Sequence, residues 1–184
     1  MKMYPKISLT GDLGSGKSHV SRLLSEKLGF EIISTGLIQR EIAEKYGMTT
    51  LELNDYSRTH PKIDDEIDGK VVELSQTEQS LIFDSRLAWY FAPKSFKIYL
   101  TVDLDEAVRR IYHDKRKSED YLNKTDAKMQ IQARRQSEIE RFRQYYNFSI
   151  TLLTNYDLVI DTTHITPEAV CEKIIQAYDK WVKA

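Results

Sequence analysis

The chain has 184 residues, of which 41% are hydrophobic, and this suits one folded domain with a sizeable core. Its 27 basic and 28 acidic side chains nearly cancel, so no overall field attracts it to nucleic acid or a membrane surface, and neither is an expected partner. The single cysteine excludes an internal disulfide, and no apolar run approaches the roughly 18 residues that a membrane-spanning helix needs. The N-terminal residues show no signal-peptide pattern, so we expect a cytoplasmic protein.

Strands and helices are predicted to alternate from the first residues onward. The segment KISLTG predicts a strand that stops at Gly11, and apolar residues then recur at helical spacing until Gly29. FEIIST predicts a second strand. A polar stretch of about 37–80 predicts helix, with breaks near Gly47 and at HPK. SLIFDS and FKIYLTV predict two further strands, because short continuous apolar runs suit a sheet that is covered on both faces.

The second half of the chain begins with highly charged sequence and ends with clear elements. YDLVIDT predicts a fifth strand, and TPEAVCEKIIQAYDKWV predicts a closing helix that Thr166 caps and Pro167 begins. Strands that alternate with helices indicate a parallel sheet in an α/β layer structure. We find no repeat or linker, so the charged stretches of about 37–80 and 115–146 are expected to be insertions that move over one core.

The most specific motif is GDLGSGKS, which fits the pattern G-x-x-x-x-G-K-[ST] and stands between a predicted strand and a predicted helix. Backbone N–H groups of such a loop converge on phosphates, Lys17 can reach the β- and γ-phosphates, and Ser18 can offer its hydroxyl to Mg²⁺. We therefore predict a nucleoside triphosphate site with Mg²⁺ as a cofactor, although the motif alone does not separate a kinase from a GTPase or a mechanical ATPase. The expected nucleotide-binding residues are Gly11, Asp12, Leu13, Gly14, Ser15, Gly16, Lys17, Ser18 and His19.

Arginines are the candidates for holding the group that accepts a phosphoryl. A phosphate acceptor is already an anion, so it needs no strong base, and planar guanidinium groups can bind its oxygens in pairs. Ligands of open α/β sheets bind beyond the carboxyl ends of the strands. The arginines expected there are Arg40 after the second strand, Arg86 after the third, and Arg134 and Arg141 in the charged stretch.

Two further features have alternative interpretations. Asp84 ends the strand LIFD, where its carboxylate could orient a Mg²⁺-bound water, contact the acceptor, or only cap the next turn. The run Trp89, Tyr90 and Phe91 could wall a base pocket, although an aromatic cluster is more often core. The four histidines show no spacing typical of a metal ligand set, and no chemistry is assigned to them.

Together these segments resemble the nucleoside monophosphate kinases, and most closely the compact cytidylate kinases of the archaeal type. The resemblance covers nearly the whole chain, and HPKIDDEID and SRLAWYF are its most particular segments. It implies a three-layer P-loop NTPase fold with a five-stranded parallel sheet in a single domain of residues 1–184. It also implies a helical insertion at about 37–80 that binds the nucleoside monophosphate, and a short lid within about 115–135.

The implied reaction is the transfer of the γ-phosphoryl group of ATP to CMP or dCMP, with Mg²⁺. The implied catalytic residues are Lys17, Arg86, Arg134 and Arg141. The implied substrate-binding residues are Thr35, Arg40, Asp64, Asp84, Arg86, Arg134, Glu138 and Arg141. Ser18 and Asp84 are the expected metal ligands, and DTTH would lie near the adenine of ATP.

The chain departs from the family pattern at four positions. Leu37 stands where an acid is often found, Asp84 and Ser85 replace a glutamate and a glycine, and Ser149 replaces an aspartate. None of these changes removes a phosphate ligand, but they leave the base of the acceptor open. Two alternatives remain: a P-loop kinase for another nucleotide or small metabolite, and a nucleotide-responsive binding protein with little activity. Small nucleotides are the expected partners, and a monomer is slightly favoured.

Overall fold

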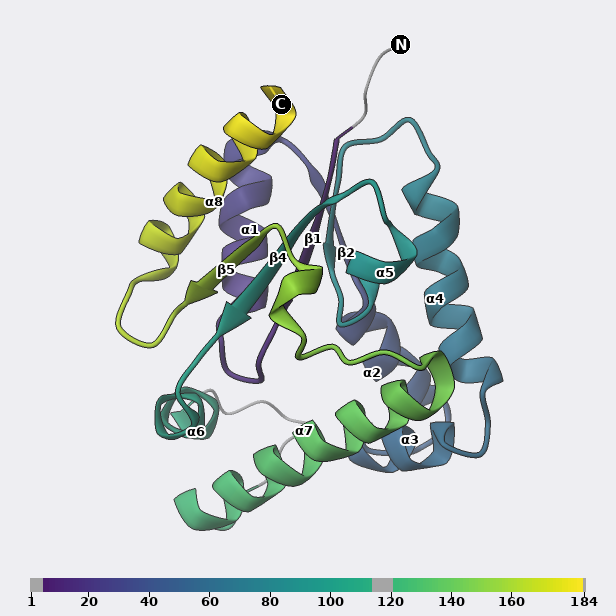
Figure 1. The fold of residues 1–184 in the computed structure, drawn as a ribbon. Helices are drawn as coiled ribbons and strands as arrows, with labels where there is room; N and C mark the ends of the chain where they lie inside the picture. Colours follow the sequence, from purple (N-terminus) through teal and green to yellow (C-terminus); the bar gives the residue numbers. More distant parts are fainter. Residues whose placement is uncertain (1–4, 114–120, 184) are drawn as a thin grey trace.

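The computed structural model describes residues 5–113 and 121–183, and its centre is a parallel sheet of five strands in the order β2-β3-β1-β4-β5 (Figure 1). The strands are β1 (Lys6–Gly11), β2 (Glu31–Ser34), β3 (Leu81–Asp84), β4 (Phe96–Thr101) and β5 (Leu158–Asp161). Each of the five predicted runs forms its strand. The carboxyl ends of the strands meet at one edge, which is where ligands of such sheets bind.

Helices cover both faces of the sheet. They are α1 (Lys17–Leu28), α2 (Thr35–Lys45), α3 (Thr50–Ser57), α4 (Lys62–Ser75), α5 (Ala88–Phe91), α6 (Leu104–His113), α7 (Lys124–Tyr146) and α8 (Pro167–Lys183), with a 3-10 turn at Leu153–Asn155. α1 and α8 pack together on one face, and α5 lies on the other (Figure 1). The predicted three-layer α/β fold is confirmed. Among the described residues, none of these helices combines the length and the apolar character needed to cross a membrane.

The main core lies between the sheet and the α1–α8 layer. Ile7 and Leu9 of β1 are fully buried there against Leu24 of α1 and Ile174 of α8. The predicted helix ends are also found. Gly29, in the left-handed conformation, ends α1, and the hydroxyl of Thr166 accepts a hydrogen bond from the N–H of Ala169 at 3.3 Å at the start of α8.

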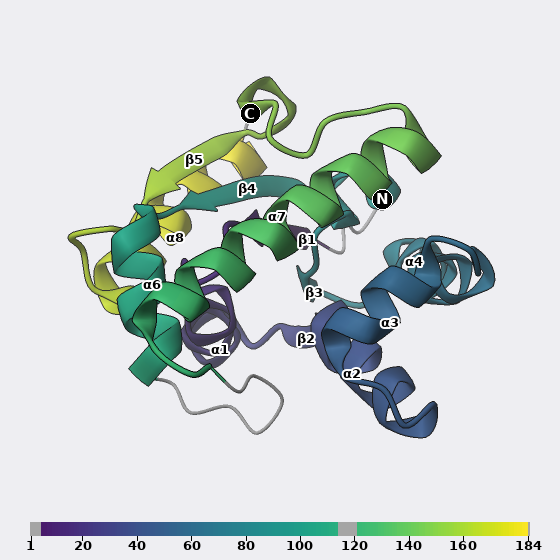
Figure 2. The same ribbon diagram turned by 90° about the horizontal axis from the view of Figure 1, so that it is seen from below.

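Three helices fill the chain between β2 and β3, in the stretch that was predicted to be helical. We call α2, α3 and α4 together the arm. The breaks expected near Gly47 and at HPK separate its helices. The arm has an apolar cluster of its own, formed by Ala43, Leu53, Ile63 and Ile67. Figure 2 shows the helices of the arm beside the carboxyl edge of the sheet.

The charged stretch contains one long helix, α7, which the sequence pattern did not reveal as continuous. It crosses below the carboxyl ends of the strands (Figures 1 and 2). Its first half packs Ala127 and Ile131 against Val108 of α6, and its second half packs Phe142 against Leu87. Of the lid expected at about 115–135, residues 115–120 lie outside the described residues, and residues 124–135 are the first half of α7.

Candidate active site

The glycine-rich loop leads from the end of β1 into α1 and leaves little room for side chains at Gly11 and Gly14. A Cβ on Gly11 would lie 2.4 Å from the carbonyl oxygen of Leu100, and one on Gly14 would lie 2.9 Å from the Cβ of Ala107. Gly14 and Gly16 both have positive φ, at 78° and 85°. The loop therefore follows β4 and α6 closely and brings backbone N–H groups to the start of α1, a geometry suited to anions.

Lys17 folds back over this loop. Its Nζ lies 3.5 Å from the carbonyl oxygen of Gly11, and the guanidinium of Arg86 donates a hydrogen bond to the same oxygen. Burial, together with the charge of Arg86, lowers the pKa of Lys17 to about 8, against the opposing effects of Asp84 and Glu138. Two of the predicted catalytic cations thus meet at one carbonyl oxygen.

Asp84, at the end of β3, is hydrogen-bonded to Ser18, in the first turn of α1. The hydroxyl of Ser18 donates to Oδ2 of Asp84 at 3.0 Å, and the Thr35 hydroxyl donates to the Asp84 carbonyl oxygen at 3.4 Å. Ser85 accepts the hydrogen bond from the N–H of Leu87 at 3.3 Å, so it caps the following turn and leaves the Asp84 carboxylate facing the loop. A hydroxyl and a carboxylate oxygen are ligands that Mg²⁺ accepts.

Glu138 of α7 joins two of the predicted arginines. Its Oε2 lies 3.1 Å from Nε of Arg86, and its Oε1 lies 3.3 Å from Nε of Arg134. Glu138 is only 7% exposed. Burial alone would raise its pKa, but Arg86 and Arg134, with smaller effects of Arg141 and Lys17, hold the pKa below its ordinary value. The carboxylate therefore stays ionised between its two cations.

Arg141 lies two turns beyond Arg134 on α7 and faces the arm. It is 4% exposed, with Nη1 3.7 Å from Oδ1 of Asp64 and donating to the Asn54 carbonyl oxygen at 3.4 Å. Burial raises the pKa of Asp64, and Arg141 opposes that rise. Arg134, Glu138 and Arg141 share one face of α7, because their spacing follows the helical period.

Arg40 does not contact the other predicted site arginines. It is exposed on α2, and no ion pair or hydrogen bond joins its side chain to any residue that the structure describes. Its Nη1 lies close to Gly36: a Cβ added to that glycine would be 3.7 Å from it. The predicted phosphate contact of Arg40 stays a prediction. The departures at Leu37 and Ser149 are also peripheral: Leu37 is half exposed, and Ser149 bonds to Thr151 at 2.9 Å.

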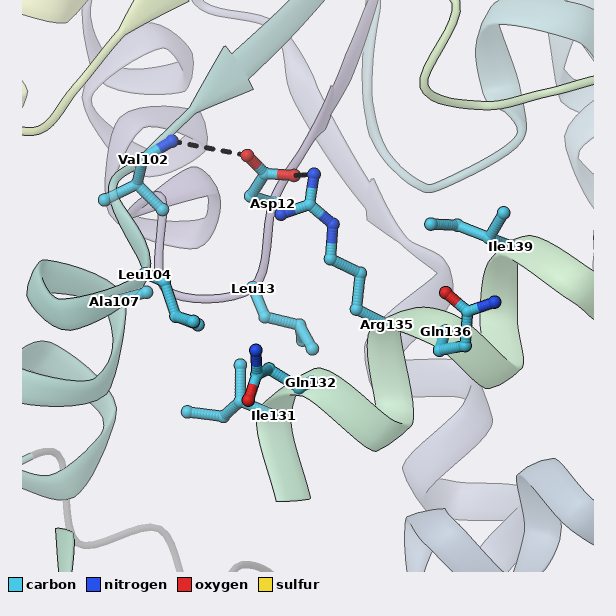
Figure 3. A pocket seen from close by; sticks show the side chains of 10 residues that line it. All are labelled: Asp12, Leu13, Val102, Leu104, Ala107, Ile131, Gln132, Arg135, Gln136 and Ile139. Atoms are coloured by element: carbon cyan, nitrogen blue, oxygen red, sulfur yellow. Dashed lines mark hydrogen bonds and ion pairs between the residues drawn. The ribbon is translucent and has the colours of Figure 1, made fainter. Parts of the chain in front are cut away.

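Sequence reasoning missed the partner of Asp12. The carboxylate of Asp12 accepts a hydrogen bond from the Tyr99 hydroxyl at 2.9 Å. It also accepts one from the Val102 N–H at 3.3 Å and pairs with Arg135 of α7 at 3.0 Å (Figure 3). The side chain of Asp12 thus faces β4 and α7, and its predicted nucleotide contact would use the backbone. A cavity of about 230 Å³ lies beside this pair, and none of the four predicted catalytic residues lines it.

Arg110 was also missed as a site residue. Its guanidinium donates to the carbonyl oxygens of Gly14 at 3.3 Å, Thr162 at 2.7 Å and Thr163 at 3.2 Å. It therefore ties the loop to the DTTH segment. Trp89, by contrast, packs with Tyr99 and Tyr156 in the core, as the alternative interpretation expected. The described residues include no group of three or more His, Cys, Asp or Glu side chains placed to hold a metal ion.

Comparison with known proteins gives a consistent result. Residues 6–164 match the Cytidylate kinase-like family. The chain is 36% identical over 169 residues to the cytidylate kinase of Methanobrevibacter smithii, and the alignment covers 92% of this chain and 95% of that protein. It is 37% identical over 179 residues to an S-adenosylmethionine-dependent nucleotide dehydratase of Lacinutrix mariniflava, covering 97% of this chain but 37% of that longer protein. A shikimate kinase structure from Bacteroides thetaiotaomicron has a TM-score of 0.63 at 17% identity, covers 98% of this chain and 99% of that one, and shows the shared fold alone.

The low pKa of Lys17 predicts a pH dependence of ATP binding. Below pH 8 the ammonium is present in the free protein, and above it the charge is lost, so affinity should fall by up to about tenfold per pH unit. Calorimetric titration with ATP and without acceptor between pH 7 and 9.5 measures this. Lys17→Ala, the control, should bind weakly at every pH. An affinity for the parent that stays constant from pH 7 to 9.5 would contradict the assignment.

Proposed function

The chain belongs to the cytidylate kinase-like family, and we propose that it transfers the γ-phosphoryl group of ATP to the phosphate of CMP or dCMP, giving ADP and the nucleoside diphosphate. The observation that carries this proposal is the meeting of Arg86 and Arg134 on Glu138, next to Lys17. These cations stand where the glycine-rich loop would hold the donor. They suit a reaction between two anions.

The charges around the loop favour a phosphate acceptor over a hydroxyl acceptor. A hydroxyl has to lose a proton, so a carboxylate should stand free beside it. Here Asp84 is bonded to Ser18, and Glu138 is held ionised between two arginines. An acceptor phosphate can bind both guanidinium groups while Glu138 stays in place, because the carboxylate lies at Nε of each arginine and each guanidinium carries further N–H donors.

The residues have distinct roles in the transfer. Loop N–H groups and Lys17 bind and orient the donor phosphates. Arg86 and Arg134 bind the acceptor phosphate and stabilise the charge that spreads over the equatorial oxygens in the transition state. Arg86 is well placed for this, since its hydrogen bond to the carbonyl oxygen of Gly11 fixes it to the end of β1. A water-excluding closure over the site would limit hydrolysis of ATP.

Ser18 and Asp84 fit a divalent cation. Their oxygens are 3.0 Å apart at the start of α1, and both are hard donors of the kind that Mg²⁺ prefers. When bound, Mg²⁺ neutralises charge on the donor phosphates. The carboxylate of Asp84 would be the stronger ligand, since Ser18 contributes a neutral hydroxyl.

The alternatives have weaker support. A kinase for a small hydroxyl metabolite shares the fold, but its acceptor would need a base that Asp84 and Glu138 do not leave free. A binding protein without turnover has no need of arginines around an acceptor. The dehydratase activity in the name of the longer relative is not transferred, because this chain spans 37% of that protein.

An acceptor panel tests the proposal directly. With saturating ATP and Mg²⁺, a coupled assay of ADP release should give the highest kcat/KM with CMP or dCMP among CMP, dCMP, UMP and AMP. The no-acceptor control should release ADP only slowly. A higher kcat/KM for UMP or AMP would refute the cytidylate assignment and leave a monophosphate kinase in place.

Replacement of Arg86 by lysine tests the role of the guanidinium fork. Arg86→Lys keeps the charge but loses paired binding, so kcat/KM for CMP should fall by at least about tenfold, or roughly 1.4 kcal/mol of transition-state stabilisation. ATP affinity without acceptor should stay within about threefold.

The matched control is Arg109→Lys, since Arg109 is exposed on α6 and pairs only locally with Glu106 at 2.7 Å. It should leave kcat/KM within about twofold of the parent. If Arg86→Lys also left kcat/KM for CMP within about twofold of the parent, the acceptor phosphate would not lie at Arg86.

A further inference from the structure

The arm meets α7 through polar contacts. The amide of Asn54 donates to the Ser137 hydroxyl at 3.3 Å, and Arg58 donates to the same hydroxyl at 2.6 Å. Further along α7, the Tyr146 hydroxyl donates to the Asp68 carboxylate. The apolar cluster of the arm and the apolar cluster around Phe142 share no residue. An interface held by hydrogen bonds can open and re-form around a ligand more easily than an apolar one.

This interface contains most of the unsatisfied polar atoms. Among the described residues, five buried side-chain atoms lack a hydrogen-bond partner, and three of them lie here: Asn54 Oδ1, Asp64 Oδ2 and Arg141 Nε. Such an atom destabilises the fold by about 1–3 kcal/mol, so a cluster of three calls for a physical reason. A ligand that supplies the missing partners would be one.

Arg141 contacts both of the other residues, and the second polar group of each side chain is already used. Nη1 of Arg141 contacts Oδ1 of Asp64 and the Asn54 carbonyl oxygen, and the Asn54 amide nitrogen is bonded to Ser137. What remains is two acceptor oxygens and one N–H donor. A matching ligand therefore presents an amino group next to an acceptor atom.

The position of the cluster suits the far end of the acceptor nucleotide. Arg141 is two turns along α7 from Arg134, on the same face of the helix. A nucleotide whose phosphate is bound by Arg86 and Arg134 can extend its base along this face toward Asn54 and Asp64. The arm would then contact the base while the sheet edge holds the phosphate.

We infer that Asn54 and Asp64 read the 4-amino group of a cytosine base, with Asn54 Oδ1 and Asp64 Oδ2 as the acceptors of its two protons. This rests on the proposed function. Carboxylate acceptance from the exocyclic amine is a known way to recognise cytosine. The Nε–H of Arg141 is left to donate to an acceptor atom of the same nucleotide. Arg141 also holds Asp64 and Asn54 together through Nη1.

The arrangement discriminates against uracil. Uracil carries a carbonyl oxygen at position 4, which would face two acceptor oxygens and leave all three buried and unpaired. Adenine presents an amino group and a ring nitrogen in the same order as cytosine, so this pattern separates CMP from UMP and not from AMP. Asn54 is thus a specificity-determining residue that the sequence did not reveal.

The isosteric variant Asp64→Asn tests the inference, because its amide can present a donor where the parent has only acceptors. We expect the ratio of kcat/KM for CMP to that for UMP to fall by at least about tenfold. The matched control is Asp68→Asn. Asp68 is buried on the same helix, one turn later, and is bonded to Tyr146 instead of Arg141. Asp68→Asn should change kcat/KM for CMP and for UMP by the same factor, so the ratio of the two should stay within about threefold of the parent's ratio.

A second measurement uses the parent protein and needs no variant. The monophosphate of a cytidine analogue that lacks the 4-amino group should show a kcat/KM at least about tenfold below that of CMP. Suppose that the parent prefers CMP to UMP, that the analogue is phosphorylated as well as CMP, and that Asp64→Asn keeps the CMP-to-UMP ratio of kcat/KM. The inference is then wrong and the proposed function stands. If the parent phosphorylates neither CMP nor UMP, both are wrong.

Discussion

The structure of the site depends on one buried carboxylate, that of Glu138, between the guanidinium groups of Arg86 and Arg134. Cations that crowd around the glycine-rich loop repel one another and would be costly to bury without a compensating anion. Because Arg86 follows β3 and Glu138 belongs to α7, the ion pair between them holds the long helix across the carboxyl edge of the sheet. The directions of Arg134 and Arg141 follow from that position.

This constraint links the two ends of the acceptor site. The Glu138 carboxylate lies at Nε of both arginines, so it can keep compensating their charge while an acceptor phosphate binds other N–H donors of the same guanidinium groups. At the other end, α7 meets the arm through hydrogen bonds and unsatisfied polar atoms instead of an apolar core. The site is therefore held by ion pairs where we propose phosphoryl transfer, and joined by hydrogen bonds where we propose that the base enters.

Local sequence was sufficient for the sheet and the loop and insufficient for α7. Short apolar runs and the GDLGSGKS motif are local signals, and they located each strand and the cation pair at the loop. α7 has no continuous apolar face, because Ile131 packs on α6, Phe142 packs beside Leu87, and charged residues between them face the site. The pairing of Asp12 with Arg135 and the contact of Asn54 with Arg141 join segments far apart in the chain, so no spacing could reveal them.

The central claim is that the cation cluster receives a phosphate and not a hydroxyl group. Release of ADP from ATP in the presence of CMP, of cytidine, or of no acceptor tests this most directly, since cytidine has the same base and sugar but no phosphate. The account predicts rapid ADP release with CMP and, with cytidine, a rate equal to that without acceptor. ADP release stimulated by cytidine as strongly as by CMP would contradict it.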